Sequence, residues 1–360
     1  MALKIVRGKA LPIGVDLGSS ILKMAQLRQM NDTIELLAAG SAEIPWDCRK
    51  DLPRRLEFLT KSVRSTLRSN QFKGRRCIVS LPAEATYVQH LRVPKGTSEE
   101  TQQVVECELQ GKLPYAVKDA VVRHIVAGEV FGEGEIKQEV IAVAAARATL
   151  EVYLQMAARA GLDVIGVNIE PCAIVECFSR LFRRSTDTAR TILFVDMGAV
   201  STQVVLSHGD RIVFARNLFT AGDLLDRAVA DGMKIPIEQA RNMRQHLVKA
   251  KADTPAEDEL YHLLDPPLDA LADELTQCLR YYESVFRNQG IERAIFLGGQ
   301  ANDKRLCQAI AKRLNLPAQV GDPLARVQRV EGAGMAIGLD RREPQPNWAV
   351  AVGLSLGAAA

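Results

Sequence analysis

Residues 11–20 read Leu-Pro-Ile-Gly-Val-Asp-Leu-Gly-Ser-Ser, an apolar run that ends in the triplet Asp-x-Gly followed by two serines. The same pattern returns half a chain later, because residues 191–200 read Thr-Ile-Leu-Phe-Val-Asp-Met-Gly-Ala-Val. Each copy is followed by a second run with the composition of a strand. Each copy is therefore predicted to form a β-hairpin that carries an aspartate, Asp16 or Asp196, at the tip of its first strand.

The chemistry of these turns favours an anion with a cation beside it. Glycine lets the turn bring backbone N–H groups close to a bound group, and such N–H groups favour anions, of which phosphate is the usual one. An acidic residue beside a phosphate repels it unless a cation lies between them, which indicates Mg²⁺ held through water. A single copy of this pattern is more often an ordinary turn at the end of a strand. Two copies half a chain apart predict two similar α/β halves that face each other across a cleft.

A third motif lies near the end of the chain. Residues 294–301 read Ala-Ile-Phe-Leu-Gly-Gly-Gln-Ala, which is an apolar strand, a glycine pair and the start of a helix. Glycines at such a turn allow a flat ligand to approach the backbone closely, as in dinucleotide-binding folds. Taken alone, this motif is more often a plain strand-to-helix turn. Together with the two hairpins it predicts a nucleotide-binding cleft.

Composition limits the classes of protein to consider. The chain has 360 residues, enough for two or more compact units. Its net charge of +3 gives no general case for nucleic-acid binding, and its seven cysteines form no metal-binding spacing, as expected of reduced cytosolic thiols. The N-terminus lacks the apolar core of a signal peptide, and residues 348–360 are too short an apolar tail to cross a bilayer. We therefore expect a cytoplasmic protein, at most peripheral to the inner membrane.

Local signals predict several boundaries between elements. Ser98 and Asn302 are expected to cap helices. Residues 268–289 are predicted to form a long amphipathic helix, preceded by a polar loop at residues 252–258. A polar linker at residues 184–189 is expected just before the second hairpin.

These motifs resemble those of the actin-like ATPase superfamily and, within it, the PilM family of type IV pilus assembly proteins, which is related to the division protein FtsA. Residues 16–23 match the first phosphate motif, residues 196–202 the second, and residues 297–299 the adenosine motif. Residues 170–173 and 350–356 resemble the two segments that connect the halves. The resemblance covers nearly the whole chain. It implies an α/β fold with two duplicated actin-like (ribonuclease-H-like) halves around a nucleotide cleft and a small inserted α/β subdomain.

The resemblance also gives a predicted domain organisation. Residues 1–81 and 168–190 would form the first actin-like half, and residues 82–167 the inserted subdomain that binds a partner. Residues 191–345 would form the second half, and residues 346–360 would return to the first half.

ATP and Mg²⁺ are the cofactors that the resemblance implies. Asp16 and Asp196 would hold the hydrated metal ion from opposite walls of the cleft. Glu170 would orient an attacking water as the catalytic residue, although a capping role before Pro171 explains this glutamate equally well. The predicted nucleotide-binding residues are Asp16, Gly18, Ser19, Ser20, Lys23, Asp196, Gly198, Ala199, Thr202, Gly222, Gly298, Gly299 and Gln300.

Two stretches depart from the family pattern. Gln300 follows the glycine pair, where relatives often have Gly, Ser or Thr. Residues 239–244 read Gln-Ala-Arg-Asn-Met-Arg, where relatives tend to have Glu-Ala-Glu-x-x-Lys. Arg241 therefore reverses a charge near the ribose contact that the resemblance implies.

The resemblance implies an ATP-binding scaffold of a type IV pilus or related secretion platform at the inner membrane, with at most slow ATPase activity. Its inserted subdomain would bind the N-terminal peptide of a membrane-anchored partner, and self-association is a further option. One alternative is a phosphotransferase of the sugar-kinase type, which needs a base for an acceptor hydroxyl. Another is a division protein like FtsA, although residues 354–360 lack the amphipathic anchor expected there.

A basic run remains outside these roles. Residues 49–76 contain ten Lys and Arg but only two acids. Such a run either docks on anionic lipid or an acidic partner, or is a solvated helix face, which is the commoner case.

Overall fold

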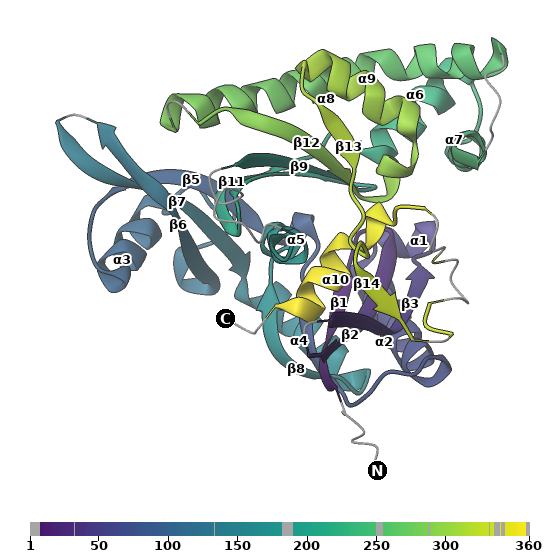
Figure 1. The fold of residues 1–360 in the computed structure, drawn as a ribbon, viewed down its shortest axis with the longest axis horizontal. Coiled ribbons are helices and arrows are strands. Elements are labelled where there is room, and N and C mark those ends of the chain that lie inside the picture. The colour runs from purple at the N-terminus through teal and green to yellow at the C-terminus, as the bar shows by residue number, and fades with distance from the viewer. Residues whose placement is uncertain are drawn as a thin grey trace.

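A computed structural model describes residues 8–31, 33–132, 134–181, 190–249, 255–286, 289–330, 332–334, 339 and 343–357. Two lobes lie one above the other in Figure 1, each built on a twisted sheet, and a third, smaller sheet projects to one side. The predicted linker at residues 184–189 lies outside the described residues, as does the first part of the predicted loop at residues 252–258.

The first lobe is built on a six-stranded sheet with the order β14-β3-β2-β1-β4-β8. β1, β2 and β3 form an antiparallel meander, and β4 adds to β1 in parallel. Asp16 is the last residue but one of β1 and lies directly opposite Lys23 on β2, as the predicted hairpin requires. The strands are β1 (Lys9–Leu17), β2 (Ile21–Met30), β3 (Thr33–Glu43), β4 (Arg76–Ser80), β8 (Asp163–Asn168) and β14 (Val327–Arg329).

The second lobe repeats this plan in a five-stranded sheet with the order β11-β10-β9-β12-β13. β9, β10 and β11 form the meander, and β12 adds to β9 in parallel, so Asp196 on β9 lies opposite Gln203 on one side and Leu297 on the other. The predicted duplication of the two halves is confirmed. The strands are β9 (Thr191–Met197), β10 (Thr202–His208), β11 (Arg211–Leu218), β12 (Ile291–Leu297) and β13 (Ala318–Val320).

Two helices lie between the lobes, α5 (Glu170–Ser179) and α10 (Ala349–Leu356), and one hydrophobic core joins them to both sheets (Figure 1). Their axes approach closely because small residues meet at the contact. A Cβ on Gly353 would stand 1.8 Å from the carbonyl oxygen of Ala173, and one on Gly14 of β1 would stand 2.0 Å from that of Ala351. Glycine is therefore required at both positions, and α5 and α10 form the shared axis of the molecule.

The outer helices cover the far face of each sheet. The first-lobe helices are α1 (Trp46–Arg49), α2 (Leu52–Ser69) and α4 (Arg147–Arg159), and the second-lobe helices are α6 (Gly222–Met233), α7 (Ile237–Lys249), α8 (Pro255–Val285) and α9 (Lys304–Leu314). Among the residues that the structure describes, none of the helices has the length and apolar character that a membrane crossing requires.

Helix α8 begins before the predicted start at residue 268 and contains Pro266 and Pro267 in its interior. Proline disfavours a helix interior because it removes a backbone donor and crowds the preceding turn. The apolar face nevertheless continues through the proline pair, since Leu260, Leu264 and Leu268 are all buried in the core of the second lobe. Packing against the sheet therefore outweighs the local preference that the sequence prediction relied on.

The inserted subdomain is a three-stranded antiparallel sheet with the order β5-β7-β6 and one helix, and it carries its own small core. Its elements are β5 (Tyr87–Pro94), α3 (Ser98–Glu108), β6 (Ala120–Gly132) and β7 (Glu135–Ala146).

Two of the predicted domain boundaries differ from the sheets. The insert was predicted to end at residue 167, but α4 packs on α2 and β8 pairs in parallel with β4, so both elements belong to the first lobe. The second half was predicted to run to residue 345, but β14 pairs in parallel with β3 of the first lobe. Each difference depends on a partner strand that is distant in the sequence, which local patterns do not identify.

A buried carboxylate fastens the insert to the second lobe. Glu139 on β7 is fully buried and accepts hydrogen bonds from His90 Nδ1 at 3.0 Å, from Arg92 Nε at 3.3 Å and from the hydroxyl of Tyr281 on α8 at 2.6 Å. Burial raises the pKa of Glu139, but these hydrogen bonds outweigh it and the pKa lies below its ordinary value. His90 also accepts from the N–H of Ala215 on β11 at 3.2 Å.

Two helix caps lie one residue from their predicted positions. Thr97, and not Ser98, caps α3, through a reciprocal capping box with Glu100. Asp303, and not Asn302, caps α9 by accepting from the N–H of Leu306 at 3.0 Å. In each case the cap is the residue whose side-chain oxygen reaches the amide three positions on.

Candidate functional site

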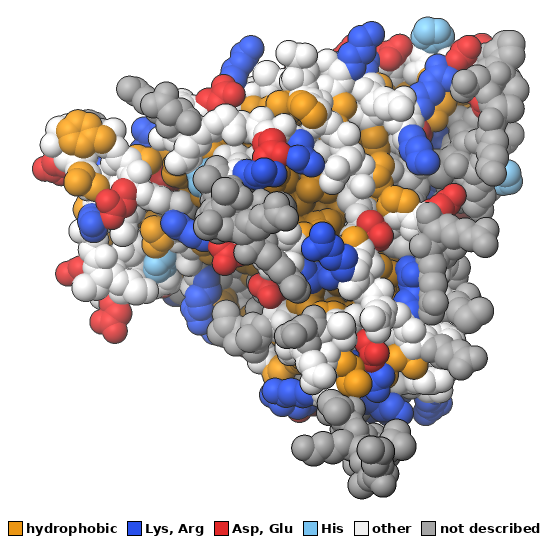
Figure 2. Space-filling view, in the orientation of Figure 1, with side chains coloured by type: hydrophobic (Ala, Val, Ile, Leu, Met, Phe, Trp, Pro, Cys, Tyr) orange, Lys and Arg blue, Asp and Glu red, His pale blue; other side chains and the backbone are white. Residues whose placement is uncertain are grey.

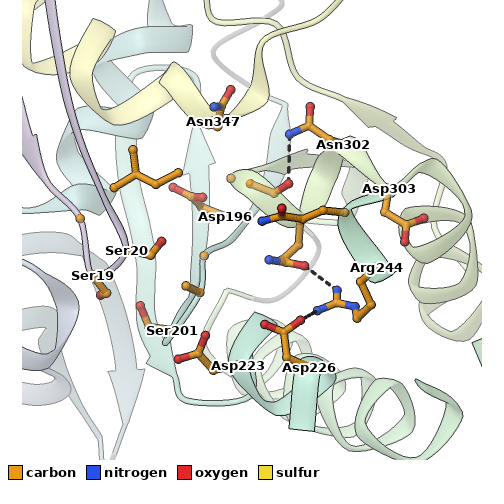
Figure 3. A pocket seen from close by; sticks show the side chains of 18 of the residues that line it. Ser19, Ser20, Asp196, Ser201, Asp223, Asp226, Arg244, Asn302, Asp303 and Asn347 are labelled. Carbon is orange, nitrogen blue, oxygen red and sulfur yellow. Dashed lines mark hydrogen bonds and ion pairs between the residues drawn. The ribbon is translucent and has the colours of Figure 1, made fainter. Parts of the chain in front are cut away.

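A cavity of about 920 Å³ opens between the two lobes and is lined by both hairpins and by the glycine-pair turn. Figure 3 shows Ser19, Ser20, Asp196 and Ser201 on one side of it and Asp226, Arg244 and Asp303 on the other. The predicted site residues that line the cavity are Asp16, Gly18, Ser19, Ser20, Lys23, Glu170, Asp196, Gly198, Ala199, Gly298, Gly299 and Gln300. The structure therefore brings together residues that lie far apart in the sequence.

Two predicted residues do not line the cavity. Thr202 is fully buried, and its hydroxyl donates to the carbonyl oxygen of Thr220 at 2.8 Å. Gly222 lies behind Gln300, because a Cβ at this position would stand 2.4 Å from Gln300 Nε2. Ser201 is the residue that lines the cavity in place of its neighbour Thr202.

Three carboxylates share the centre of the cavity with one lysine. Lys23 Nζ lies 3.2 Å from Asp16 Oδ2 in a nearly buried ion pair. Burial raises the pKa of Asp196 to about 7, with Lys23 lowering it and the charge of Asp16 raising it further. Burial also raises the pKa of Glu170 well above its ordinary value, and the charges of Asp16 and Asp196 add to this effect. An added cation would therefore favour the ionised forms of Asp196 and Glu170.

Gln203 holds Glu170 in place, and the sequence analysis missed it. Its side-chain amide donates to Glu170 Oε2 at 2.6 Å, while its own Oε1 is buried without a hydrogen-bond partner among the described residues. The predicted hairpin could have identified Gln203 as a site residue. Gln203 stands directly opposite Asp196, and side chains of directly opposite residues lie on the same face of a sheet.

A buried arginine supports the first hairpin turn from behind. Arg55 on α2 is only 4% exposed. Its guanidinium donates to three successive carbonyl oxygens, those of Leu17 at 3.1 Å, Gly18 at 2.9 Å and Ser19 at 3.2 Å. Three charge-assisted hydrogen bonds fix the turn that carries the predicted phosphate contacts.

The glycine-pair turn requires its first glycine. Gly298 has a φ of +82°, and a Cβ there would stand 2.4 Å from Asp196 Oδ1. A Cβ on Gly299 would meet nothing within 4 Å, so this side of the turn faces open space. The glycine pair thus lets the turn sit directly against Asp196 and leaves room for a flat ligand.

Paired arginines fill the end of the cavity beside α6 and α7. Arg244 is buried and donates to Asp226 Oδ1 at 2.5 Å and to Gln300 Oε1 at 2.6 Å, as Figure 3 shows. Arg241 Nε donates to Asp226 Oδ2 at 3.0 Å. These contacts join α6, α7 and the glycine-pair turn into one network of charges.

A second set of contacts crosses from the first lobe to the second beside the cavity. The Arg241 guanidinium lies over the ring of Trp46 on α1, 4.4 Å from its centroid, and Arg49 lies 5.1 Å from the same centroid. Arg49 Nη1 also lies 3.8 Å from Asp223 Oδ1 on α6. Burial and the charge of Arg241 lower the pKa of Arg49, while Asp223 raises it. We call the four residues Trp46, Arg49, Asp223 and Arg241 the interlobe clasp.

The donor set fits a hydrated cation. In the described part of the chain, no group of three or more His, Cys, Asp or Glu side chains is placed to hold a metal ion directly. Asp16 and Asp196 instead present carboxylates to one cavity, with a raised pKa at Asp196 that an added positive charge would relieve. Mg²⁺ commonly keeps several waters and binds through one or two carboxylates plus phosphate oxygens.

A family model described as type IV pilus assembly protein PilM matches residues 14–359. The chain belongs to this family.

Solved structures confirm the actin-like fold of this PilM-family chain. The structure titled PilM-PilN type IV pilus biogenesis complex is 21% identical, covers 96% of this chain and 97% of that chain, and gives a TM-score of 0.79. Ethanolamine utilization protein EutJ from Carboxydothermus hydrogenoformans is 14% identical over 97% of this chain and 89% of that chain, with a TM-score of 0.54. MreB5 of Spiroplasma citri bound to ADP is 11% identical over 96% of this chain and 94% of that chain, with a TM-score of 0.51.

The two departures from the PilM-family pattern meet in the structure. Arg244 and Gln300 bond to each other, and Arg241 shares Asp226 with Arg244. The charge that Arg241 reverses is thus balanced by acids on α6.

Proposed function

We propose that the protein is an ATP-binding scaffold of a type IV pilus assembly platform at the cytoplasmic face of the inner membrane. The observation that carries this proposal is the cluster of three carboxyl groups between the duplicated hairpins, where Asp16, Glu170 and Asp196 line one cavity and Lys23 pairs with Asp16. A site of this kind favours a hydrated cation together with the phosphates that the hairpin turns would hold.

Each wall of the cavity has a role in this proposal. Asp16 and Asp196 would hold the waters of Mg²⁺, which would neutralise charge between the phosphates and the two carboxylates. The turns at Gly18 and Gly198 would offer backbone N–H groups to the phosphates. The open side of Gly299 would accept the nucleoside, next to the network of Arg244 and its partners.

Slow hydrolysis at most is expected from the state of Glu170. Burial and the charges of Asp16 and Asp196 raise its pKa well above the ordinary value of a glutamate, so the carboxyl is harder to ionise before a cation enters the cavity. The amide of Gln203 fixes the direction of this side chain. These features favour a protein that responds to bound nucleotide over one that turns it over rapidly.

Isothermal titration calorimetry with Mg·ATP tests the nucleotide site. Asp16→Ala and Asp196→Ala are each expected to weaken binding roughly a hundredfold or more, because each removes a carboxylate of the cation site. Glu343→Ala is the matched control, since Glu343 is an exposed glutamate that lines the same cavity. Equal affinity in the wild type and both aspartate variants would refute the proposed site.

The partner in this proposal is a membrane-anchored pilus assembly protein that offers its N-terminal peptide to the insert. Family membership supports it, as does the overall likeness to the chain solved in a PilM-PilN complex. A phosphotransferase or an FtsA-like division protein is less well supported, because the family match spans residues 14–359.

Hydrogen–deuterium exchange with a synthetic N-terminal partner peptide locates the contact. We expect slower exchange in β5, β6 and β7 of the insert and unchanged exchange in α8 and α9. A scrambled peptide of the same composition is the control. Protection confined to the second lobe would place the partner site elsewhere.

A further inference from the structure

Six exposed cations lie together at one end of the first lobe, on α2, α4 and the segment that enters β4. Figure 2 shows Lys and Arg side chains along the lower edge of this lobe, where α2 and β8 lie in Figure 1. We call this group the basic end of the lobe, and its members are Arg64, Arg68, Lys73, Arg75, Arg76 and Arg159.

Hydrogen bonds hold these residues on one surface. The Arg64 guanidinium donates to the carbonyl oxygen of Arg159, so the second half of α2 lies against the end of α4. The N–H of Asp163, four residues after Arg159, donates to the carbonyl oxygen of Arg75 at 2.9 Å. Gln26 of β2 bonds to both the N–H and the carbonyl oxygen of Lys73. These bonds place the backbone of the basic residues on one surface.

None of the six forms an ion pair with a carboxylate among the described residues, whereas several other exposed cations do. On the same helix, Arg54 lies 3.6 Å from Asp51 and Lys61 lies 2.6 Å from Glu57. In the insert, Lys112 lies 3.1 Å from Glu108. Like charges held close together repel one another, so the basic end gains more from an external anion than these paired cations do.

The chemistry of this surface matches phosphate. Five of the six cations are arginines, whose planar guanidinium groups bind phosphate oxygens in pairs. A protein partner of ordinary kind would need an apolar centre in its interface. None of the large hydrophobic side chains that are exposed in the described residues lies within residues 60–76 or in α4. Phospholipid headgroups need no such centre.

We propose that the basic end docks on an anionic phospholipid surface. It lies at the amino ends of β4 and β8, while Asp16 and Ser80 mark the opposite ends of the neighbouring strands β1 and β4. A membrane bound at the basic end would therefore leave the cavity free to bind and release its ligand. Attachment would be purely electrostatic, reversible and weakened by salt.

Vesicle co-sedimentation of the full chain, without partner or nucleotide, tests this inference. We expect binding to phosphatidylcholine vesicles that contain about 30% phosphatidylglycerol, little binding to pure phosphatidylcholine, and loss of binding as salt rises from about 0.05 M to about 0.3 M. The triple variant Arg68→Glu, Arg75→Glu, Arg76→Glu is expected to bind about a hundredfold more weakly, since each of the three cations near an anionic surface contributes roughly fivefold.

The control variant carries Arg54→Glu, Lys61→Glu and Lys112→Glu, which change the net charge equally but replace exposed cations that already have acidic partners. It should retain most of the binding. The proposal is overturned if the wild type fails to bind anionic vesicles, if it binds neutral vesicles equally well, or if both triple variants lose binding to the same extent. Thermal melting of each variant shows whether it is folded. The experiment is independent of ATP, so its failure would leave the nucleotide site untouched.

Discussion

At the scale of single residues, Asp196 is the group through which pH acts on the cavity. Burial raises its pKa to about 7, and its role in the proposed site requires the ionised form. A cation that enters the cavity favours the ionised carboxylate, so binding must release the proton that the free protein holds. Glu170, with its own raised pKa, acts in the same direction.

The affinity for Mg·ATP is therefore expected to rise about tenfold from about pH 6 to about pH 8, as one carboxyl with a pKa of about 7 loses its proton. Calorimetry in two buffers with different ionisation enthalpies measures both the affinity and the proton release. Glu343→Gln, at an exposed carboxylate that lines the cavity, should keep the full pH dependence. An affinity that falls with rising pH would contradict the assignment.

Residues of the hairpins show what a sequence does and does not reveal about a site. Asp16, Lys23 and Asp196 were predictable because the Asp-x-Gly turns fix their place at the strand ends. Thr202 was assigned to the site by proximity to the motif alone, but it pairs with Met197 and shares that residue's buried face. Strand alternation would have selected Gln203 instead.

At the scale of elements, the interlobe clasp joins α1 of the first lobe to α6 and α7 of the second. Its centre is the half-buried ring of Trp46, which Arg241 and Arg49 both contact. A cation over an aromatic ring is worth about 0.5–2 kcal/mol, depending on how far it is removed from water. Arg49, Asp223 and Arg241 of the clasp line the cavity, so we expect the clasp to slow the release of a ligand.

Trp46→Ala is expected to speed the dissociation of a fluorescent ATP analogue about threefold or more, because it removes the ring that both arginines contact. Stopped-flow displacement by excess ATP measures this rate. Trp46→Phe keeps an aromatic face and should dissociate at a rate closer to that of the wild type. Identical rates in all three proteins would show that the clasp does not control release.

The clasp and the arginine network were beyond sequence reasoning for the same reason. Arg241 was recognised as a reversed charge, but its partners Trp46 and Asp226 lie far from it in sequence and meet it only in the folded chain. The predicted start of α8 and the predicted assignment of β8 to the insert were wrong for a similar reason. In both cases packing against partners that are distant in the sequence overrides the local signals.

At the scale of the whole molecule, the duplicated plan was predictable because each half begins with the same motif. The order of the elements along the chain was sufficient to predict the two sheets, the insert and the return of α10 to the first lobe. Less predictable was the buried contact of Glu139 with Tyr281, which ties the partner-binding insert of the proposal to the second lobe. A change in the angle between the lobes would therefore act on the insert through this bond.

The short strand β14 limits how far the two lobes can move apart. It follows the second-lobe strand β13 in the chain, yet it is hydrogen-bonded to β3 at the outer edge of the first lobe. The segment between β13 and β14 thus crosses from the second lobe to the first, and a strand at each of its ends is paired in the sheet of that lobe. When the lobes move apart, the length of the segment between β13 and β14 sets the largest separation at which β14 can stay paired with β3.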